Sequence, residues 1–422
     1  MSVTDKSGVD FKQVTIGPVS VEIPNDWDLV SLEDVAENSG EYGANASAQP
    51  FDLGEFRYIR ITDLTEDGRL KNNDKQSIPI EGNEKYELEN GDLLFARTGA
   101  VGRTYLYSES DSEVPCAFAG YLIRYKLSDK IDQEYLRQYT DSEYFNKWVN
   151  SVARSTTHAN INASEYSSVD IPYPPLAEQR RIADILSTVD EQIQQTDEII
   201  ESTEELRIGL MNEFFHTGYN QHSTTTKGTL GETPTDWDVC PLSDVADVEM
   251  GSSPKSEYYN TTGEGLPFFQ ANNEFGYRLP THDRWCSEPK KIAEEGDTLV
   301  TIRGTYVGQV NVAPERCCIG RGLAAVSATD VDQEYLYHQL AHREKYVKSI
   351  ASGSTFDSIN STELRSLSVQ VPPRDEQKKI ASCLRTLQHR YAEEIEYKET
   401  LQELKRGLMQ DLLTGKVRVN TD

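Results

Sequence analysis

The feature that most constrains this chain is a helix expected over residues 174–217, far longer than the core helices of globular domains. The segment begins with two prolines, contains a single glycine, and carries mostly apolar residues at alternating steps of four and three from Ile182 to Phe214. This 3.5-residue spacing is typical of the contact face of a coiled coil. The helix would be ~60 Å long at ~1.5 Å per residue. Thr203 and Arg207 weaken the centre of its contact face, so it needs a partner.

The partner helix is expected over residues 372–415 of the same chain. Its contact positions run from Ile380 to Leu412 and follow those of the first helix at a constant offset of 198 residues (380 − 182). Both helices end in similar sequences, ELRIGLM at 205–211 and ELKRGLM at 403–409. Because a two-fold repeat turns one helix against the other, we expect the two copies to pack antiparallel.

The repeat also covers the segments that precede each helix. Trp27 and Trp237 lie in matching stretches at an offset of 210 residues (237 − 27), and both are expected in the core. Residues 58–63 and 268–273 have the same offset (268 − 58), and each run is typical of a strand that ends in polar side chains. The globular parts are therefore expected to be two copies of one fold.

A further repeated element combines a turn, a buried strand and a glycine-rich loop. It spans residues 91–103 in the first half and 296–308 in the second, and the alignment matches Arg97 with Arg303 after one inserted residue. Short strand-like runs separated by Gly and Pro predict an α/β (α+β) fold, with a small mixed or antiparallel sheet in each half.

The charge of the chain is strongly negative. Asp and Glu number 70 against 42 Lys and Arg, which gives a formal net charge of −28 and a pI near 4.7. Nucleic-acid binding ordinarily requires a basic surface. The acidic excess is spread along the chain, however, as expected of a protein from a salt-rich cytoplasm, where screening shortens the reach of the repulsion. The charge alone therefore does not exclude DNA binding.

The cysteines and the hydropathy indicate the compartment. The six cysteines form no Cys-x-x-Cys pair, which favours reduced thiols over a zinc site or a disulfide framework. No apolar run approaches the ~20 residues of a membrane span. These patterns predict a cytoplasmic protein with no bound metal and no membrane contact.

The repeated motifs, in one order and twice over, resemble the specificity subunit of Type I restriction-modification enzymes. They are the Pro-x-x-Trp-Asp segments, the Gly-Asp-x-Leu strands that continue into Arg/Gly loops, and Pro-Pro-x-x-Glu-Gln at 174–179 and 372–377. The similarity extends from near Ile23 to Val419. The resemblance implies two target recognition domains, each reading one half of a split DNA sequence, separated by helices that dock methyltransferase subunits.

The resemblance also implies the partners and the domain organisation. The expected partners are double-stranded DNA, methyltransferase subunits numbering two, and a restriction and translocase subunit. No catalytic residue, metal or cofactor is expected in this chain. With a pseudo-two-fold internal repeat, the expected parts are an N-terminal tail, recognition domain 1, a central spacer helix, a linker, recognition domain 2 and a C-terminal spacer helix: 1–20, 21–173, 174–217, 218–231, 232–371 and 372–415.

The sequence motifs that could indicate an enzyme fail on inspection. The proline pairs at 174–175 and 372–373 lack the polar residue of an adenine methyltransferase loop and instead mark helix starts. His338 and His342 have the spacing of a zinc protease, but glutamine replaces the general-base glutamate, and we expect a solvated helix face. The alternative to DNA recognition is a coiled-coil scaffold with two protein-binding domains.

The candidate DNA-binding residues lie in the polar turns and loops. Arg60 has the fork that can bind guanine O6 and N7, while the amides of Gln270 and its neighbours can pair with adenine. Matching positions carry different side chains, as two domains that read different half-sites require. The alternative is that these are ordinary polar residues at strand ends. The expected DNA-binding residues are Arg60, Thr62, Arg97, Arg103, Arg154, His158, Gln270, Asn272, Asn273 and Arg303.

Overall fold

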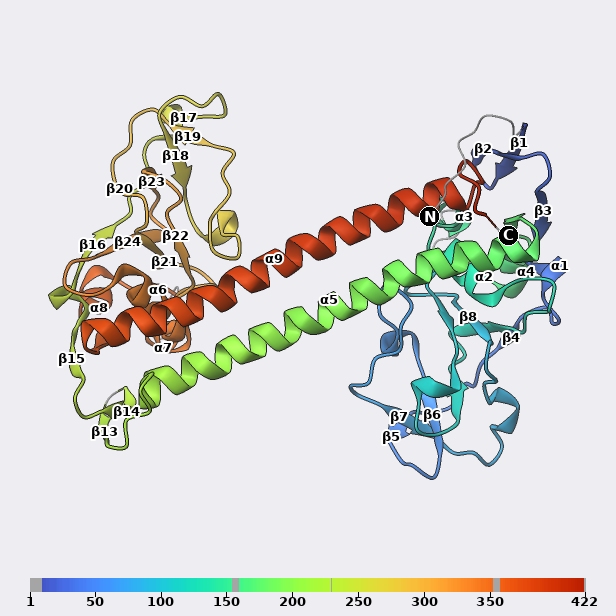
Figure 1. The fold of residues 1–422 in the computed structure, drawn as a ribbon, viewed down its shortest axis with the longest axis horizontal. Coiled ribbons are helices and arrows are strands. Elements are labelled where there is room, and N and C mark those ends of the chain that lie inside the picture. Colours follow the sequence, from blue (N-terminus) through green and yellow to red (C-terminus); the bar gives the residue numbers. More distant parts are fainter. Residues whose placement is uncertain (1–9, 154–158, 229, 352–356, 421–422) are drawn as a thin grey trace. The chain divides into compact units, whose positions relative to one another are not determined.

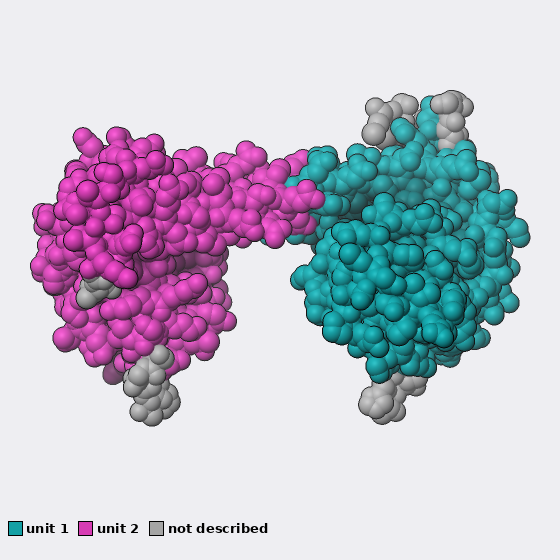
Figure 2. All heavy atoms as spheres, turned by 90° about the horizontal axis from the view of Figure 1, so that it is seen from below, with its two compact units in different colours: residues 1–195, 398–422 teal, residues 196–397 magenta. Residues whose placement is uncertain are grey.

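The computed structural model describes residues 10–153, 159–228, 230–351 and 357–420 (Figure 1). The chain forms two compact units, coloured separately in Figure 2. The first unit is built from residues 1–195 and 398–422, and the second from residues 196–397. Each unit therefore holds one globular domain, part of one long helix and the complementary part of the other. No described helix is long and apolar enough to cross a bilayer.

The two long helices are α5 (Leu176–Thr217) and α9 (Arg374–Leu412). In the first unit, Ile182 shares a core with Leu412, whereas Ile193, further along α5, packs against Leu401, which is earlier in α9. In the second unit, the late α5 residue Phe214 packs with Ile380 near the start of α9. Within each unit the two helix segments thus run antiparallel, which confirms the expectation from the repeat.

The coiled-coil spacing predicted the buried face of both helices. Every expected contact position from Ile182 to Phe214 and from Ile380 to Leu412 is at least partly buried. Polar residues on this face find charged partners, since Arg207 forms two 2.7 Å bonds with Glu204 and Lys405 lies 2.7 Å from Asp190. Two polar contact positions, Arg207 and Lys405, are therefore satisfied by ion pairs.

A repeated contact between a tryptophan and a glutamate fixes each domain to its helix. The indole N–H of Trp27 donates to Glu178 at 3.1 Å, and that of Trp237 donates to Glu376 at 3.2 Å. All four side chains are buried, which confirms the two tryptophans as core residues. The glutamate of each Pro-Pro-x-x-Glu-Gln motif therefore has a structural role.

The glutamine of the same motif binds the globular domain a second time. Gln179 accepts a bond from the backbone N–H of Asp132 at 2.8 Å, and Gln377 accepts one from Asp332 at 2.7 Å. Asp132 and Asp332 are the N-caps of α2 (Gln133–Thr140) and α6 (Gln333–His342). One motif thus sets the orientation of a domain helix against a long helix in both units.

The first unit contains two four-stranded sheets, with strand orders β10-β6-β7-β5 and β4-β11-β8-β9, and the pairs β1-β2 and β12-β3. Among the described residues of this unit, every ladder is antiparallel except β10 with β6. The strands are β1 Phe11–Ile16, β2 Val19–Pro24, β3 Asp28–Ser31, β4 Glu41–Tyr42, β5 Gln49–Pro50, β6 Phe56–Ile59, β7 Gln76–Ile78, β8 Leu93–Ala96, β9 Thr104–Leu106, β10 Cys116–Phe118, β11 Leu122–Tyr125 and β12 Asp170–Tyr173. The other helices are α1 Leu32–Val35, α3 Glu143–Ala153 and α4 Ala163–Ser167, with 3-10 turns η1 Ile61–Asp63, η2 Glu84–Tyr86 and η3 Glu109–Asp111.

The second unit repeats this architecture with sheets β16-β24-β21-β22 and β17-β19-β18-β23-β20 and the pairs β13-β14 and β15-β25. Its parallel ladder, β18 with β23, matches that of the first unit. The strands are β13 Thr225–Gly228, β14 Gly231–Pro234, β15 Asp238–Pro241, β16 Ala246–Met250, β17 Tyr259–Asn260, β18 Leu266–Phe269, β19 Trp285–Cys286, β20 Ile292–Ala293, β21 Thr298–Thr301, β22 Val310–Val312, β23 Cys317–Ile319, β24 Leu323–Ala328 and β25 Ser368–Val371. Its other helices are α7 Glu344–Ala351 and α8 Ser361–Arg365, with 3-10 turns η4 Leu242–Asp244, η5 Ser256–Tyr258 and η6 Asn272–Glu274.

Two expectations from the sequence need correction. The described part of the tail expected at 1–20 forms a hairpin, since β1 pairs with β2 and buries Ile16 and Val21. The linker expected at 218–231 likewise contains β13, which pairs with β14. Each of these strands is short and pairs with the next strand of the chain. The polar residues around both hairpins made these strands hard to recognise in the sequence.

The helix face around His338 is also different from the expectation. His338 is fully buried on α6 rather than solvated, and its Nε2 lies 3.2 Å from Oε1 of Glu334. Burial lowers the pKa of His338, although the nearby carboxylate of Glu334 opposes that shift. On the same helix, Tyr337 accepts a bond from Gln388 of α9 at 2.8 Å and His342 stacks on Phe215 of α5, contacts that the local sequence did not reveal.

Candidate nucleic-acid interface

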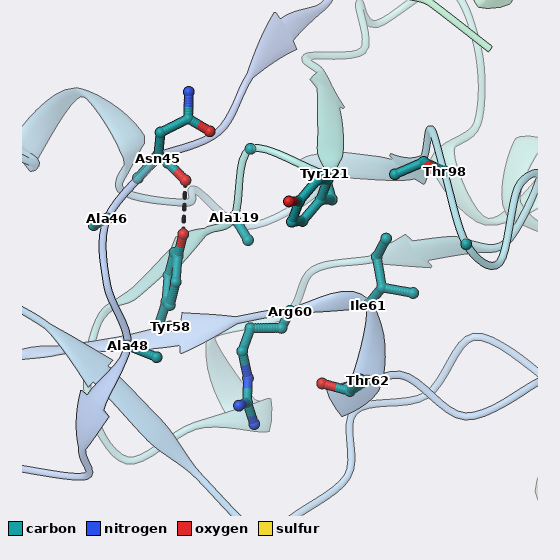
Figure 3. A pocket seen from close by; sticks show the side chains of 13 residues that line it. Asn45, Ala46, Ala48, Tyr58, Arg60, Ile61, Thr62, Thr98, Ala119 and Tyr121 are labelled. Atoms are coloured by element: carbon teal, nitrogen blue, oxygen red, sulfur yellow. Dashed lines mark hydrogen bonds between the residues drawn. The ribbon is translucent and has the colours of Figure 1, made fainter. Parts of the chain in front are cut away.

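Four turns of the first unit meet around a hollow of about 830 Å³ (Figure 3). They are the loop at 44–48, the turn at 60–62, the loop at 98–99 and the turn at 119–121. Backbone hydrogen bonds hold them together, from Gly120 to Ala44 at 2.8 Å and from Arg97 to Tyr121 at 3.0 Å. The ends of the two sheets therefore present one continuous face built from distant parts of the sequence.

The lining of the hollow is largely apolar, with a few polar groups. Tyr121 is 65% exposed, and its ring borders the hollow (Figure 3). Tyr58 donates its hydroxyl to the carbonyl of Ala44 at 2.6 Å, and burial raises its pKa, so the phenol stays protonated. The side chains of Asn45 and Thr62 supply further hydrogen-bonding atoms. An exposed aromatic ring beside amide and hydroxyl groups can contact both the edges and the methyl groups of bases.

Arg60 lines the hollow, but its fork is already occupied. Its Nε and Nη2 donate to Asp63 at 2.9 and 2.6 Å, and Nη2 also donates to the backbone carbonyl of Asp74 at 3.0 Å. Hydrogen bonding with Asp63, followed by Asp74, raises the pKa of Arg60. The guanidinium turns away from Tyr121 in Figure 3. A bidentate contact with guanine would require Arg60 to leave these carboxylates.

The other arginines expected in the first unit are also engaged. Arg97 stacks over the ring of Tyr42 at 4.8 Å and donates to Asn160 at 3.3 Å, and Arg103 donates to the carbonyl of Leu64 at 3.0 Å. The three expected arginines that the structure describes in this unit, Arg60, Arg97 and Arg103, therefore make contacts within the domain. Arg154 and His158 lie outside the described residues.

The second unit builds the corresponding face with a one-residue shift in its polar turn. The strands before the two turns match at an offset of 210. The 3-10 turn after Ala271, however, matches the turn after Arg60 at an offset of 211 (271 − 60). In both turns the backbone N–H of the N-cap residue donates to a carboxylate three residues later. Asn273, rather than Asn272, thus takes the position of Thr62. Asn273 is exposed, whereas Asn272 donates to Gln309 at 3.5 Å.

The expected match between Arg97 and Arg303 is wrong. The carbonyl of Arg97 accepts a bond from the backbone N–H of Ile161 at 2.9 Å. In the second unit the equivalent bond, at 3.0 Å, runs from the N–H of Ile359 to the carbonyl of Ile302. Arg97 therefore corresponds to Ile302, and Arg303 corresponds to Thr98. The inserted residue lies later, in the loop itself, and it leaves Arg303 exposed before Gly304, whose φ is +92°.

Two residues of the face were missed by the sequence reasoning. Tyr121 and Asn45 both line the hollow, yet neither belongs to a repeated motif. The glycine before Tyr121 was the available signal, because a Cβ on Gly120 would lie 2.3 Å from Oδ1 of Asn45. Within the described ranges, no cluster of His, Cys, Asp and Glu could hold a metal ion.

Comparison with known proteins gives a consistent result. A family model described as the Type I restriction modification DNA specificity domain matches residues 24–205 and again residues 234–406. The putative type I restriction enzyme MjaX specificity subunit of Methanocaldococcus jannaschii is 31% identical over 98% of this chain and 97% of its own length. The MjaVIII specificity subunit of the same organism is 23% identical, over 94% of this chain and 95% of its own.

Solved structures share the fold. A chain from a structural study of complex assembly and conformational transition in the type I R-M system is 25% identical, with a TM-score of 0.55, over 93% of this chain and 99% of that one. A Type-I restriction-modification system S subunit from M. genitalium is 17% identical, with a TM-score of 0.64, over 92% of this chain and 96% of that one. The second likeness concerns the fold alone.

Proposed function

We propose that this chain, which belongs to the family of Type I restriction-modification DNA specificity proteins, reads the two halves of a split DNA sequence with the turn-built faces of its two units. The chain is a Type I specificity subunit with two target recognition domains, and such subunits are non-catalytic. The methylation and cleavage chemistry belongs to other subunits of the complex. No cofactor is proposed for this chain.

The observation that best supports this proposal is that the two units share the same backbone turn but carry different side chains on it. The turn after the parallel strand is closed by the same backbone bond in both units, at 2.8 Å in residues 119–122 and 3.0 Å in residues 320–323. Its exposed side chain differs, however, since Tyr121 of the first unit corresponds to Gly322 of the second. A fixed scaffold with variable tips is what two domains reading different half-sites require.

We propose different roles for the exposed and the engaged residues. Tyr121, Asn45 and Thr62 of the first unit, and Asn273 and Arg303 of the second, are free to approach base edges. Contacts of this kind specify sequence, whereas contacts to phosphate position the protein. Arg60, Arg97 and Arg103 shape the first face through their internal partners and can add charge near the DNA backbone. Gln270, Asn272, Arg154 and His158 remain candidates from the sequence.

We propose that the long helices bind the methyltransferase subunits, one at each copy of the repeated helix end. Leu206 and Leu404 occupy matching positions, at an offset of 198 (404 − 206), and both are about half exposed. A Cβ added to Gly209 or Gly407 would meet nothing within 4 Å. Two equal and open faces support two identical partners, with a restriction subunit joining that assembly. Because genomic DNA is the target, we place the complex in the cytoplasm.

Mapping of adenine methylation tests the proposed function. The chain is expressed with the methyltransferase subunit of its host in a strain whose DNA is otherwise unmethylated, and modified adenines are located by sequencing. We expect one bipartite motif with a gap of a single length, since continuous helices join the two domains. A continuous motif, or a gap of several lengths, would contradict the proposal.

Two substitutions then separate the half-sites. Tyr121→Ala should relax recognition in one half only, and Asn273→Ala in the other half only, each at a cost of ~1–3 kcal/mol for the base contact that is lost. The control is Leu53→Ala, because Leu53 is 66% exposed in the first unit but precedes β6, whereas the hollow lies beyond the end of that strand. Loss of both halves through either substitution would exclude independent reading.

A further inference from the structure

Arg321 lies at the tip of the turn between β23 and β24 of the second unit. It takes the position of Gly120, because the turns at 320–323 and 119–122 are closed by equivalent backbone bonds. In the first unit the end of the Asn45 side chain covers this position, since a Cβ on Gly120 would lie 2.3 Å from Oδ1 of Asn45. The first domain therefore has a glycine covered by Asn45 where the second presents an arginine.

The neighbouring loop explains why the second unit has room for Arg321. The counterpart of Asn45 is Ser253, since the residues before them, Ala44 and Ser252, donate equivalent backbone bonds at 2.8 and 3.1 Å. The shorter Ser253 does not cover the turn. Its hydroxyl instead accepts a bond from the backbone N–H of Arg321 at 3.3 Å. The exchange of Asn for Ser thus both opens the position and holds the backbone of Arg321.

Two glycines place Arg321 beside the polar turn that was expected to read DNA. A Cβ on Gly320 would lie 2.9 Å from Cα of Gln270, and a Cβ on Gly322 would lie 2.6 Å from the carbonyl oxygen of Gln270. Only residues without side chains can approach a backbone this closely. Gly322 also donates its N–H to Gln270 at 3.2 Å. Arg321 is consequently carried on a turn packed directly against Gln270.

The side chain of Arg321 is exposed, and its guanidinium has no hydrogen bond or ion pair with any described residue. In the first unit, by contrast, Arg60 is held by Asp63 at 2.6 Å. All five N–H donors of Arg321 remain available to a ligand.

We propose that Arg321 is a specificity-determining residue of the second recognition domain and that its guanidinium binds O6 and N7 of a guanine in the major groove. The inference rests on the proposed function. A planar fork on an anchored backbone suits bidentate recognition of one base, for which an arginine bound to guanine is the commonest pairing. The second half-site should therefore contain a guanine next to the base pairs contacted by the turn at 270–273.

The experiment compares methylation motifs of the complete complex carrying Arg321→Ala, Arg321→Lys or Arg316→Ala. Arg316 is a matched control, because it is exposed on the same unit, pairs with Glu294 at 3.2 Å, and lies before β23, whereas Arg321 follows that strand. We expect Arg321→Ala to remove a guanine preference at one position of one half-site and to reduce methylation of the original motif roughly tenfold or more. Arg321→Lys should behave in the same way, since lysine has charge but no fork.

The possible outcomes distinguish the inference from the function on which it rests. An unchanged motif with uniformly weaker methylation, rescued by Arg321→Lys, would show a phosphate contact and overturn the inference. An unchanged motif at full methylation would also overturn it, and so would relaxation of both halves. A wild-type motif that is continuous would refute the proposed function itself. Thermal melting of each variant shows whether folding is intact, and a loss of specificity matched by Arg316→Ala would count against the assignment.

Discussion

Replacing Glu178 by Gln tests the junction that fixes the first recognition domain to α5. Glu178 is buried and accepts three bonds, from Trp27 at 3.1 Å and from Nε and Nη2 of Arg418 at 2.7 and 2.8 Å. A glutamine of the same size removes the charge and turns an amide N–H₂ group toward these donors. Arg418 keeps its two 3.0 Å bonds with Asp26, so its positive charge still has one carboxylate partner.

The expected cost follows from this geometry. Breaking a buried ion pair by removing one partner costs about 3–5 kcal/mol, and we expect about 3 kcal/mol because Arg418 remains paired with Asp26 and partly solvated. For a unit of this size, about 2–4 °C per kcal/mol corresponds to a drop in Tm of roughly 6–12 °C. Urea unfolding, followed by tryptophan fluorescence, measures the change in free energy of unfolding. The m-value should be the same for the wild type and the variant.

The matched variant in the second unit is Glu376→Gln. Glu376 accepts from Trp237 at 3.2 Å, from the backbone N–H of Asn220 at 3.2 Å, and contacts His222 at 3.1 Å, so no arginine loses its partner. We expect a smaller cost of about 1–2 kcal/mol for this variant. Equal costs in the two units, or a loss below about 1 kcal/mol for Glu178→Gln, would refute the argument that the buried ion pair is what distinguishes these junctions.

Three further measurements test other parts of the structure. Burial lowers the pKa of His342 to about 4 from its ordinary 6.5, so the unfolded state binds more protons between these values. The free energy of unfolding should therefore fall as pH falls through that window. His342→Gln should reduce this pH-dependent loss by about 1–2 kcal/mol, as measured by urea unfolding at each pH. Gly209→Ala should raise stability by ~0.5–1 kcal/mol because an added Cβ has open space, whereas Gly43→Ala should lower it because Cβ would lie 2.3 Å from the carbonyl of Phe118. The Tm should rise from ~0.1 M to ~3 M KCl as screening weakens repulsion among carboxylates, and a flat curve would contradict adaptation to salt.

The long helices could be predicted because periodicity is a local property of the sequence. The positions from Ile182 to Phe214 are spaced for one contact face, and the repeat at an offset of 198 (380 − 182) supplied the partner. The function of the proline-flanked motif could not be obtained in this way. Glu178 and Gln179 bind residues distant in the chain, Trp27 and Asp132, and only the folded domain brings these groups together.

The recognition face was only partly predictable for a related reason. Residue type suggested that Arg97 matches Arg303, but backbone hydrogen bonds show that the insertion comes after the strand and not before the arginine. A shift of one residue reverses the side of a strand on which a side chain lies. The DNA contact of Arg60 stays a prediction, and its partners Asp63 and Asp74 could not be foreseen because the folded turn brings them to it. The exposed Tyr121 had no motif to mark it.

The acidity of the chain is compatible with its proposed reading of DNA, because salt screens charge repulsion but not hydrogen bonds made at contact. At ~0.1 M salt the screening length is ~10 Å, and a net charge of −28 would repel the DNA backbone, whereas near ~1 M it falls to ~3 Å. Hydrogen bonds to base edges act only at contact and survive such salt, while affinity from phosphate contacts falls steeply with it. A specificity subunit working at high salt therefore gains most from a few arginines and amides held at the tips of rigid turns, as at Arg321 and Asn273. We infer that general attraction to the DNA backbone is left to the partner subunits.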